Sequence, residues 1–420
     1  MIDNREYTVY KELKAANKIN YRGYLMQDIL ATDFVFHAYG RLGSTGVINT
    51  FKNLILIEDT KNLEKQLVNH GVLFTTSNYG KGHRNLLDAI VNELDRAFTY
   101  TNISKRKLKF NIVNLLISFW QIFFKHKTNV SFFTRMFFFS KLVRYKNFID
   151  ELEKIATPIN IKSYVAHLSC LADDSIYCQF FKKRGINTYC IQHGVFASDY
   201  EYKTKIPFDV INIENFQADY MLAWGESVRL SMIKQGFRND QFVLAGNPKY
   251  KNIKKIRLKK SDFNNVVVCL ARDLYLNENL QLLEIVSNLE NFGIKAFIKF
   301  HPKSNTTLYA RAIDKNNLQV LEQTISLNES IKQNNIDFTI VYNSTVYYEF
   351  YILGLISFRF SINENDIIFA LNDSFSNYEE LVNKINKFKT LNYIELSRDA
   401  NVMVNKFCAL GVNNYKNILC

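Results

Sequence analysis

Polar side chains that could bind a phosphorylated ligand follow two short apolar runs in the second half of the chain. His301 ends one run, and Ser344 and Thr345 end another, while Glu349 lies about one helical turn further on. A helix N-terminus with free N–H groups and neighbouring hydroxyls binds phosphate or carboxylate well. A carboxylate one turn into the helix could reach a ribose hydroxyl. The pattern predicts half of a nucleotide-sugar site.

The elements that would position these residues are strands of a parallel sheet. Both apolar runs are short and rich in β-branched and aromatic residues, which is typical of strands buried on both faces. Ligands of open α/β sheets bind at the carboxyl ends of such strands. Lys303 and Arg272 follow two of the predicted strands in the same way and are further candidates for a donor phosphate. Ordinary strand stops, helix caps and surface cations are the alternative interpretation.

The first half of the chain repeats this pattern of an apolar strand followed by polar residues, and some of these polar residues could act as a general base. Asp173 and Asp174 open a helix after the apolar run 163–168, and His193 follows the run 186–191. A carboxylate or an imidazole can deprotonate an attacking hydroxyl. The alternatives are helix capping for the two aspartates and a backbone hydrogen bond for the histidine.

A basic segment between a predicted strand at 72–77 and a predicted helix at 85–98 is a weaker candidate. It contains Gly82, His83 and Arg84, which could hold an acceptor sugar or a phosphate. It has neither the dinucleotide fingerprint nor the P-loop spacing, so a simple basic turn is the alternative. An earlier strand is predicted at 53–59.

Length and composition bound the architecture. A chain of 420 residues suits two domains, and 47% apolar with 22% charged residues is typical of a globular protein. We expect a first domain at 1–248, a linker at 249–261 and a second domain at 262–420. The net charge of +13 favours an anionic partner. AT-rich coding is an alternative source of the many lysines.

Cysteine, histidine and hydropathy patterns indicate the compartment and the cofactors. The six cysteines show no CxxC pair, and the histidines form no ligand-spaced cluster, so we expect no metal and no other cofactor. The start lacks a signal-peptide pattern and no apolar run could span a bilayer, which favours the cytoplasm. The basic, aromatic segment at 104–147 could lie on the inner membrane face or cover the first sheet.

Four short motifs carry a resemblance that extends over about residues 160–360. They are Gln192-His193-Gly194, Gly246-Asn247-Pro248, Lys299-Phe300-His301-Pro302-Lys303 and Ser344-Thr345 with Glu349. Together they resemble bacterial surface-polysaccharide glycosyltransferases, namely capsule-type sialyl and Kdo transferases and CDP-glycerol glycerophosphotransferases. The resemblance implies an α/β protein with the GT-B fold, in which two Rossmann-like domains face each other across a cleft.

The resemblance also implies roles for individual residues. His301, Ser344 and Thr345 would hold the donor phosphate, Glu349 would contact the ribose, and His193 would lie beside the reacting centre. The chain departs from the glycerophosphotransferase pattern because no Trp precedes His193 and no Thr-Pro follows the glycine. It also lacks the acidic-acidic-Gly motif of the sialyl and Kdo groups.

The expected function is transfer of a sugar, with inversion, from a nucleotide donor to a glycan or lipid-linked acceptor of capsule or lipopolysaccharide assembly. A CMP or CDP donor is favoured, and a UDP donor is left open. The alternatives are a UDP-sugar 2-epimerase, an alditol-phosphate transferase and a polyanion-binding protein without enzymatic activity. No nucleic-acid-binding motif is present, so we expect no nucleic-acid partner.

Overall fold

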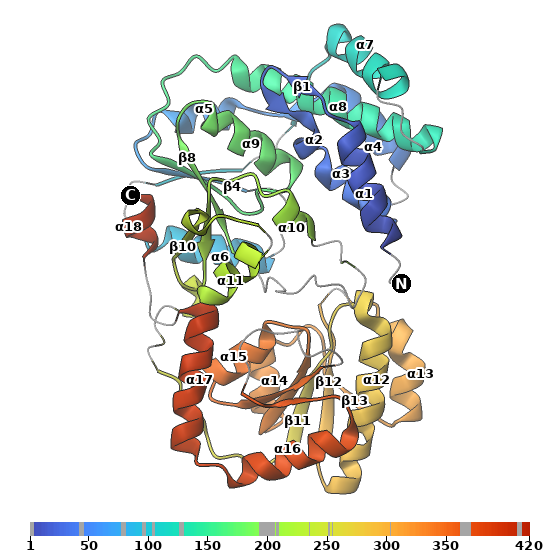
Figure 1. Cartoon of the computed structure of the whole chain (residues 1–420), viewed down its shortest axis with the longest axis vertical. Helices are drawn as coiled ribbons and strands as arrows, with labels where there is room; N and C mark the ends of the chain where they lie inside the picture. The colour runs from blue at the N-terminus through green and yellow to red at the C-terminus, as the bar shows by residue number, and fades with distance from the viewer. Residues whose placement is uncertain are drawn as a thin grey trace.

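The computed structural model describes most of the chain, namely residues 4–41, 46–76, 81–94, 98–102, 106–125, 130–192, 206, 210–234, 236–250, 253, 255–302, 304–361, 371–409 and 414–420. These residues form two α/β halves, each built on a six-stranded parallel sheet (Figure 1). Two Rossmann-like domains stacked in this way form the GT-B fold that the sequence predicts.

The first sheet has the strand order β10-β9-β8-β7-β4-β5. Its strands are β4 (Val72–Thr76), β5 (Phe98–Asn102), β7 (Ser163–Ala166), β8 (Asn187–Ile191), β9 (Tyr220–Ala223) and β10 (Phe242–Leu244). All of β7 and most of β8 are buried, which explains why their sequences are almost continuously apolar. The strand order reverses between β4 and β7, and ligands of open α/β sheets bind at such switch points.

Among the described residues, the shorter connections between strands of this sheet contain helices. These helices are α6 (Lys81–Val91), α9 (Ala172–Lys182), α10 (Ile211–Glu214) and α11 (Glu226–Lys234). The prediction of a loop before residue 85 is wrong, because Gly82, His83 and Arg84 already belong to the first turn of α6.

The residues before β4 pack on the first sheet and share a core with it. Their elements are α1 (Arg5–Ala16), β1 (Asn20–Tyr21), β2 (Tyr24–Leu25), α2 (Met26–Ile29), α3 (Ala31–Ala38), α4 (Gly46–Ile55), β3 (Leu56–Glu58) and α5 (Lys61–Leu67). The strand predicted at 53–59 is mostly wrong, because α4 continues to Ile55. Packing of α4 against α8 overrides the β-propensity of this run.

Three further elements follow β5 and contain the basic, aromatic segment. β6 (Arg106–Leu108) pairs antiparallel with β3, and α7 (Ile112–Trp120) continues as a π-helix at Gln121–Lys125. α8 (Phe132–Glu153) is one long helix whose second half is buried in the first domain. Among the described residues, no helix is long and apolar enough to cross a membrane.

The second sheet has the strand order β13-β12-β11-β14-β15-β16. Its strands are β11 (Asn265–Cys269), β12 (Lys295–Lys299), β13 (Gln319–Val320), β14 (Phe338–Tyr342), β15 (Ile356–Phe360) and β16 (Ser374–Phe375). Its helices are α12 (Leu276–Ser287), α13 (Ala310–Lys315), α14 (Leu327–Gln333), α15 (Val346–Ile352), α16 (Tyr378–Thr390) and α17 (Tyr393–Cys408). The strand order reverses between β11 and β14.

The end of the chain returns to the first domain. The C-terminal end of α17 lies at the boundary between the halves (Figure 1), and α18 (Tyr415–Leu419) packs with residues of β4 and β7. The Tyr415 hydroxyl donates to the carbonyl of Gly246 at 2.7 Å, and the Ser163 hydroxyl donates to the carbonyl of Leu419 at 3.2 Å. The last helix of the chain therefore packs in a core of the first domain.

Candidate functional site

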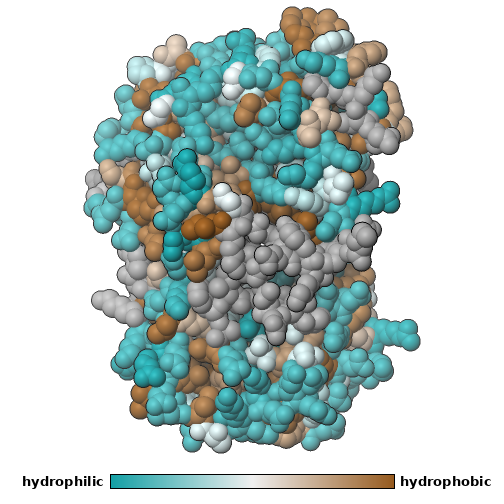
Figure 2. Space-filling model, viewed as in Figure 1, coloured by the Kyte–Doolittle hydropathy of each residue, from teal (hydrophilic) through white to brown (hydrophobic). Residues whose placement is uncertain are grey.

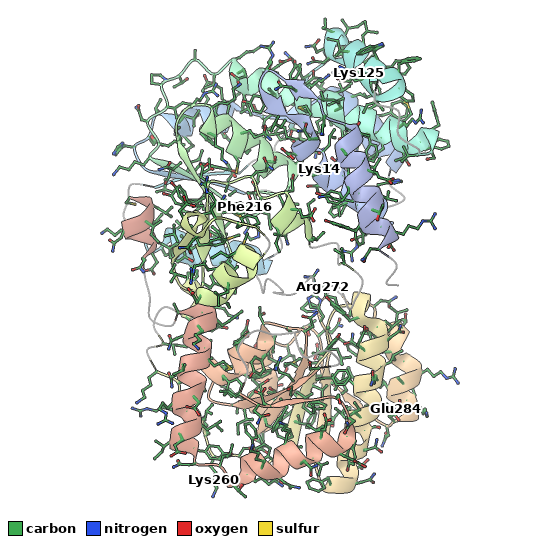
Figure 3. The ribbon with its side chains drawn as sticks, in the orientation of Figure 1. Lys14, Lys125, Phe216, Lys260, Arg272 and Glu284 are labelled. Atoms are coloured by element: carbon green, nitrogen blue, oxygen red, sulfur yellow. The ribbon has the colours of Figure 1, made fainter. Side chains whose placement is uncertain are left out.

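Three strands of the second sheet end level with one another at the switch point. Cys269, the last residue of β11, pairs with the last residue of β12 and with the next-to-last residue of β14. Arg272, His301 and Ser344 follow these three strand ends within three residues. The register therefore brings together three segments that follow strand ends and are far apart in the sequence. Arg272 is exposed, and its side chain extends toward the first domain (Figure 3).

Asp273 connects the exit of β11 to the exit of β12. Its Oδ2 accepts a hydrogen bond from the backbone N–H of Asn305 at 2.8 Å, and its Oδ1 accepts one from the Tyr309 hydroxyl at 3.1 Å. Burial opposes ionisation of Asp273, but these bonds and the charge of His301 lower its pKa below the ordinary value. The sequence interpretation gave Asp273 no role, and its only signal was its position directly after Arg272.

The exit of β14 turns sharply into α15. Asn343 has a φ of +39°, a left-handed conformation that asparagine tolerates better than most residues. The Ser344 hydroxyl then accepts a hydrogen bond from the N–H of Val346 at 3.3 Å. Thr345 is the N-cap residue, but its side chain makes no capping bond. Of the two hydroxyls, only that of Ser344 is therefore seen to bond a backbone N–H at the start of this helix.

Glu349 on α15 faces the turn that leaves the first domain. Its Oε2 is 2.9 Å from the Lys249 ammonium, which belongs to a short 3-10 helix at Pro248–Tyr250. Burial, and next the Glu349 carboxylate, raise the pKa of the Tyr250 hydroxyl. The Lys249 side chain is 56% exposed, so this ion pair contributes little to stability. Its main effect is to hold Glu349 at the boundary between the domains.

The carboxyl edge of the first sheet carries a second group of polar residues. Gln192, directly after β8, is buried, and its Oε1 accepts a hydrogen bond from the backbone N–H of Trp224 at 2.6 Å. Trp224 itself directly follows β9. His193 lies outside the described residues, so its predicted place beside the reacting centre stays a prediction.

Asp173 belongs to a charged cluster that the sequence did not indicate. The Arg144 guanidinium on α8 is 3.2 Å from Asp173 and also donates to Glu58 at the end of β3. Burial, and next the charge of Asp173, raise the pKa of Glu58, although Arg144 opposes this change. Asp173 keeps 26% of its side chain exposed, whereas Glu58 keeps 2%. Asp173 is therefore the member of the cluster that a ligand can reach.

Asp174 has a different environment from its neighbour. It is 1% exposed, and its Oδ2 accepts a hydrogen bond from the backbone N–H of Leu168 at 2.9 Å. Thr75 and Tyr164 contact its other oxygen, each at 3.4 Å. Asp174 therefore fixes the loop after β7, and its burial leaves it unsuited to deprotonate an acceptor.

The remaining predicted residues are less defined. The backbone of Gly82, His83 and Arg84 lies in α6, and their side chains lie outside the described part of the structure, as does all of Lys303. In the part of the chain that the structure describes, no group of three or more His, Cys, Asp or Glu residues could hold a metal ion.

The two carboxyl edges meet at Phe407 of α17. Its ring stacks on Tyr348 of α15, with centroids 3.6 Å apart and 5° between the ring planes. The Trp224 ring lies edge-on to it at 6.4 Å. Gly225 is required at this contact, because an added Cβ would lie 2.5 Å from the Phe407 carbonyl oxygen. The exit of β9 is thereby held against the helix that begins at Thr345.

Comparisons with known proteins show similarity at the level of the fold. No family model matches the chain, and no curated protein matches it. The chain is similar to a co-structure of S. aureus MnaA with UDP (TM-score 0.48, 10% identity, 83% of this chain and 94% of that chain). It is also similar to the lipopolysaccharide outer core galactosyltransferase WaaB (TM-score 0.47, 13% identity, 83% and 97%). A further similar structure is UDP-GlcNAc 2-epimerase from Neisseria meningitidis bound to UDP-GlcNAc (TM-score 0.46, 11% identity, 83% and 97%). At these identities the similarity concerns the fold alone.

Proposed function

We propose that this GT-B protein is a glycosyltransferase that moves a sugar from a nucleotide donor to a glycan or lipid-linked acceptor in capsule or lipopolysaccharide assembly. The observation that carries this proposal is the level ending of β12, β11 and β14, with Arg272, His301 and Ser344 just beyond. A cation, an imidazole and a hydroxyl at one sheet edge suit a nucleotide phosphate. CMP or CDP donors are favoured, and a UDP donor is the alternative.

The donor group would act on charge that develops during transfer. As the bond between the anomeric carbon and the phosphate oxygen breaks, the electron pair stays on the phosphate. Arg272, His301 and Lys303 would stabilise that charge, with the Ser344 and Thr345 hydroxyls as further donors. Glu349 would contact the ribose. These groups supply the electrostatic stabilisation without a metal ion, and we propose a metal-independent reaction.

The first domain would supply the base. The acceptor oxygen forms the new bond to the anomeric carbon, and its proton passes to Asp173 or His193. Direct displacement by one nucleophile inverts the configuration at that carbon. The ion pair with Arg144 already engages the Asp173 carboxylate and fixes its orientation. His193 is therefore the stronger candidate for the proton acceptor, and Asp173 for the group that orients the acceptor.

Thermal shift with CMP, CDP, UDP and GDP, without metal, tests the donor site. A nucleotide at a hundred times its dissociation constant stabilises the folded state by about 2.7 kcal/mol. We expect one nucleotide to raise the melting temperature, and His301→Ala to lose most of that increase. His70→Ala, a change at an exposed histidine, is the matched control and should keep it.

The outcomes separate the alternatives. A cytidine preference supports a sialyl-, Kdo- or alditol-type donor. A uridine preference changes the donor, and interconversion of a UDP-sugar without any acceptor would favour an epimerase. No shift with any nucleotide would refute the donor site. His193→Gln and Asp173→Asn should retain the nucleotide shift while transfer to the acceptor is lost.

A further inference from the structure

Helix α7 buries its polar side and exposes its apolar side, which is the reverse of an ordinary surface helix. Its polar residues Asn114 and Ser118 are 2% and 0% exposed. Its apolar side chains are 40–61% exposed, namely Ile112, Val113, Leu116, Ile117, Phe119 and Trp120. A helix at the surface of a globular protein normally turns its apolar stripe toward the core. The outer side of α7 is therefore built for apolar surroundings.

A buried polar network fixes this orientation. The Asn114 amide donates to Asn147 and to Asp150, both at 2.8 Å, and accepts from the Tyr21 hydroxyl at 3.0 Å. The Asn111 side chain caps the helix by accepting from the N–H groups of the first turn. Turning the apolar side inward would break these bonds and leave buried polar groups without partners, at about 1–3 kcal/mol each. The exposed apolar side is thus specified by the sequence.

The apolar surface continues beyond α7. Leu108, Phe110, Phe124, Phe132 and Phe133 are 60–78% exposed and lie before α7, after it and at the start of α8. We call these five residues and the six exposed apolar side chains of α7 the aromatic face. Figure 2 shows hydrophobic atoms gathered at the end of the molecule where Figure 1 places α7. A gathering of exposed apolar side chains of this kind marks an interaction site.

The charge of the segment identifies the partner. Residues 104–149 contain ten Lys or Arg and no Asp or Glu. In the described part of the chain, five of these cations bond carboxylates outside residues 104–149, as Lys107 and Lys109 do with Glu151 near the end of α8. Lys125 lies 5.7 Å from the ring centroid of Trp120, at the same end of the molecule in Figure 3. Aromatic side chains with cations beside them suit the headgroup region of an anionic bilayer.

Geometry excludes a spanning role and charge disfavours self-association. α7 and the π-helix that follows it cover 9 and 5 residues. Their combined length of about 20 Å is short of the roughly 30 Å of a hydrocarbon core. Two copies facing each other through this side would bring the Lys125 cations of both copies together beside Trp120, which like-charge repulsion opposes.

We propose that the aromatic face docks the protein on the surface of an anionic lipid bilayer, with α7 lying in the plane of the interface. The inference deepens the proposed function, because a lipid-linked acceptor would be presented at that surface. Docking itself requires no nucleotide, so its test is independent of the donor site.

The test is co-sedimentation of the full-length protein with vesicles. We expect binding to vesicles of equal parts phosphatidylglycerol and phosphatidylcholine, weaker binding at high salt, and little binding to pure phosphatidylcholine. The double variant Leu116→Gln/Trp120→Gln should lower the partition coefficient at least about tenfold. The matched control, Ile394→Gln/Val402→Gln, removes two apolar side chains that are 82% and 53% exposed on α17 and should bind as the wild type does.

A spectroscopic measurement gives a second readout. The chain has two tryptophans, and Trp224 is buried whereas Trp120 is 53% exposed. Anionic vesicles should therefore shift the emission of Trp120 to shorter wavelength. No binding of the wild type to anionic vesicles would overturn the proposal, as would unchanged binding of Leu116→Gln/Trp120→Gln. A dimer in light scattering that this double variant abolishes would identify a second copy as the partner instead. The nucleotide shift of the variant, measured without vesicles, should equal that of the wild type.

Discussion

Removing the Phe407 ring should uncouple the two domains. Phe407 is 4% exposed, stacks on Tyr348 and contacts Trp224 edge-on. Truncation of a buried phenylalanine to alanine costs about 3–5 kcal/mol of unfolding free energy. Phe407→Leu keeps most of the buried volume and loses mainly the ring pairs, so we expect a cost of about 1–2 kcal/mol. The difference in unfolding free energy between Phe407→Ala and Phe407→Leu gives the cost of the cavity that alanine leaves.

The assay is urea unfolding followed by tryptophan fluorescence in a Trp120→Phe background, in which Trp224 is the remaining tryptophan and reports on the domain boundary. Because a two-domain chain can unfold in more than one step, the first transition is the one to compare. Phe51→Ala is the matched control, since Phe51 is 67% exposed and its loss should change stability by less than about 0.5 kcal/mol. If Phe407→Ala lowers the unfolding free energy of the first transition no more than Phe51→Ala does, the Phe407 ring does not hold the domains together.

Two further predictions concern charged groups. Asp273→Ala removes the acceptor for Asn305 and Tyr309, so we expect a loss of about 1.5–3 kcal/mol in unfolding free energy together with weaker nucleotide binding. Unchanged nucleotide affinity would show that the His301 loop is positioned by other contacts. Burial opposes ionisation of Glu151, but hydrogen bonds led by that from Lys107 lower its pKa from 4.5 to about 2. This stabilisation is present above pH 4.5 and is lost as the pH falls toward 2, so Glu151→Gln should flatten the pH dependence of stability in that window. An acid titration of both proteins, followed by circular dichroism, measures the difference.

The buried strands were the most predictable part of the fold. Strands were expected near residues 72, 163 and 186 and shortly before Arg272, His301 and Ser344, and β4, β7, β8, β11, β12 and β14 occupy these places. A strand buried on both faces needs a continuous apolar run, and that signal is local. The strand predicted at 53–59 was mostly wrong because α4 packs against α8, a contact between segments about 90 residues apart. The return of α18 to the first domain had no local signal either.

The candidate site was likewise predictable from the sequence only in part. The positions of Arg272, His301 and Ser344 at strand ends followed from the sequence, because the polar residue that stops each apolar run is visible in it. The cluster of Arg144, Glu58 and Asp173 did not, because its members come from three elements that only the folded chain brings together.

The sequence alone determined that the chain forms buried parallel strands with polar exits, and that residues 104–149 are basic and rich in aromatic side chains. These properties follow from residue type and short-range spacing. The tertiary structure decided which exits lie side by side, since strand register is a relation between distant segments. It also decided which face of α7 is outside. Helical periodicity predicts an apolar side buried in the core, and only the polar network beneath Asn114 explains why that side is exposed.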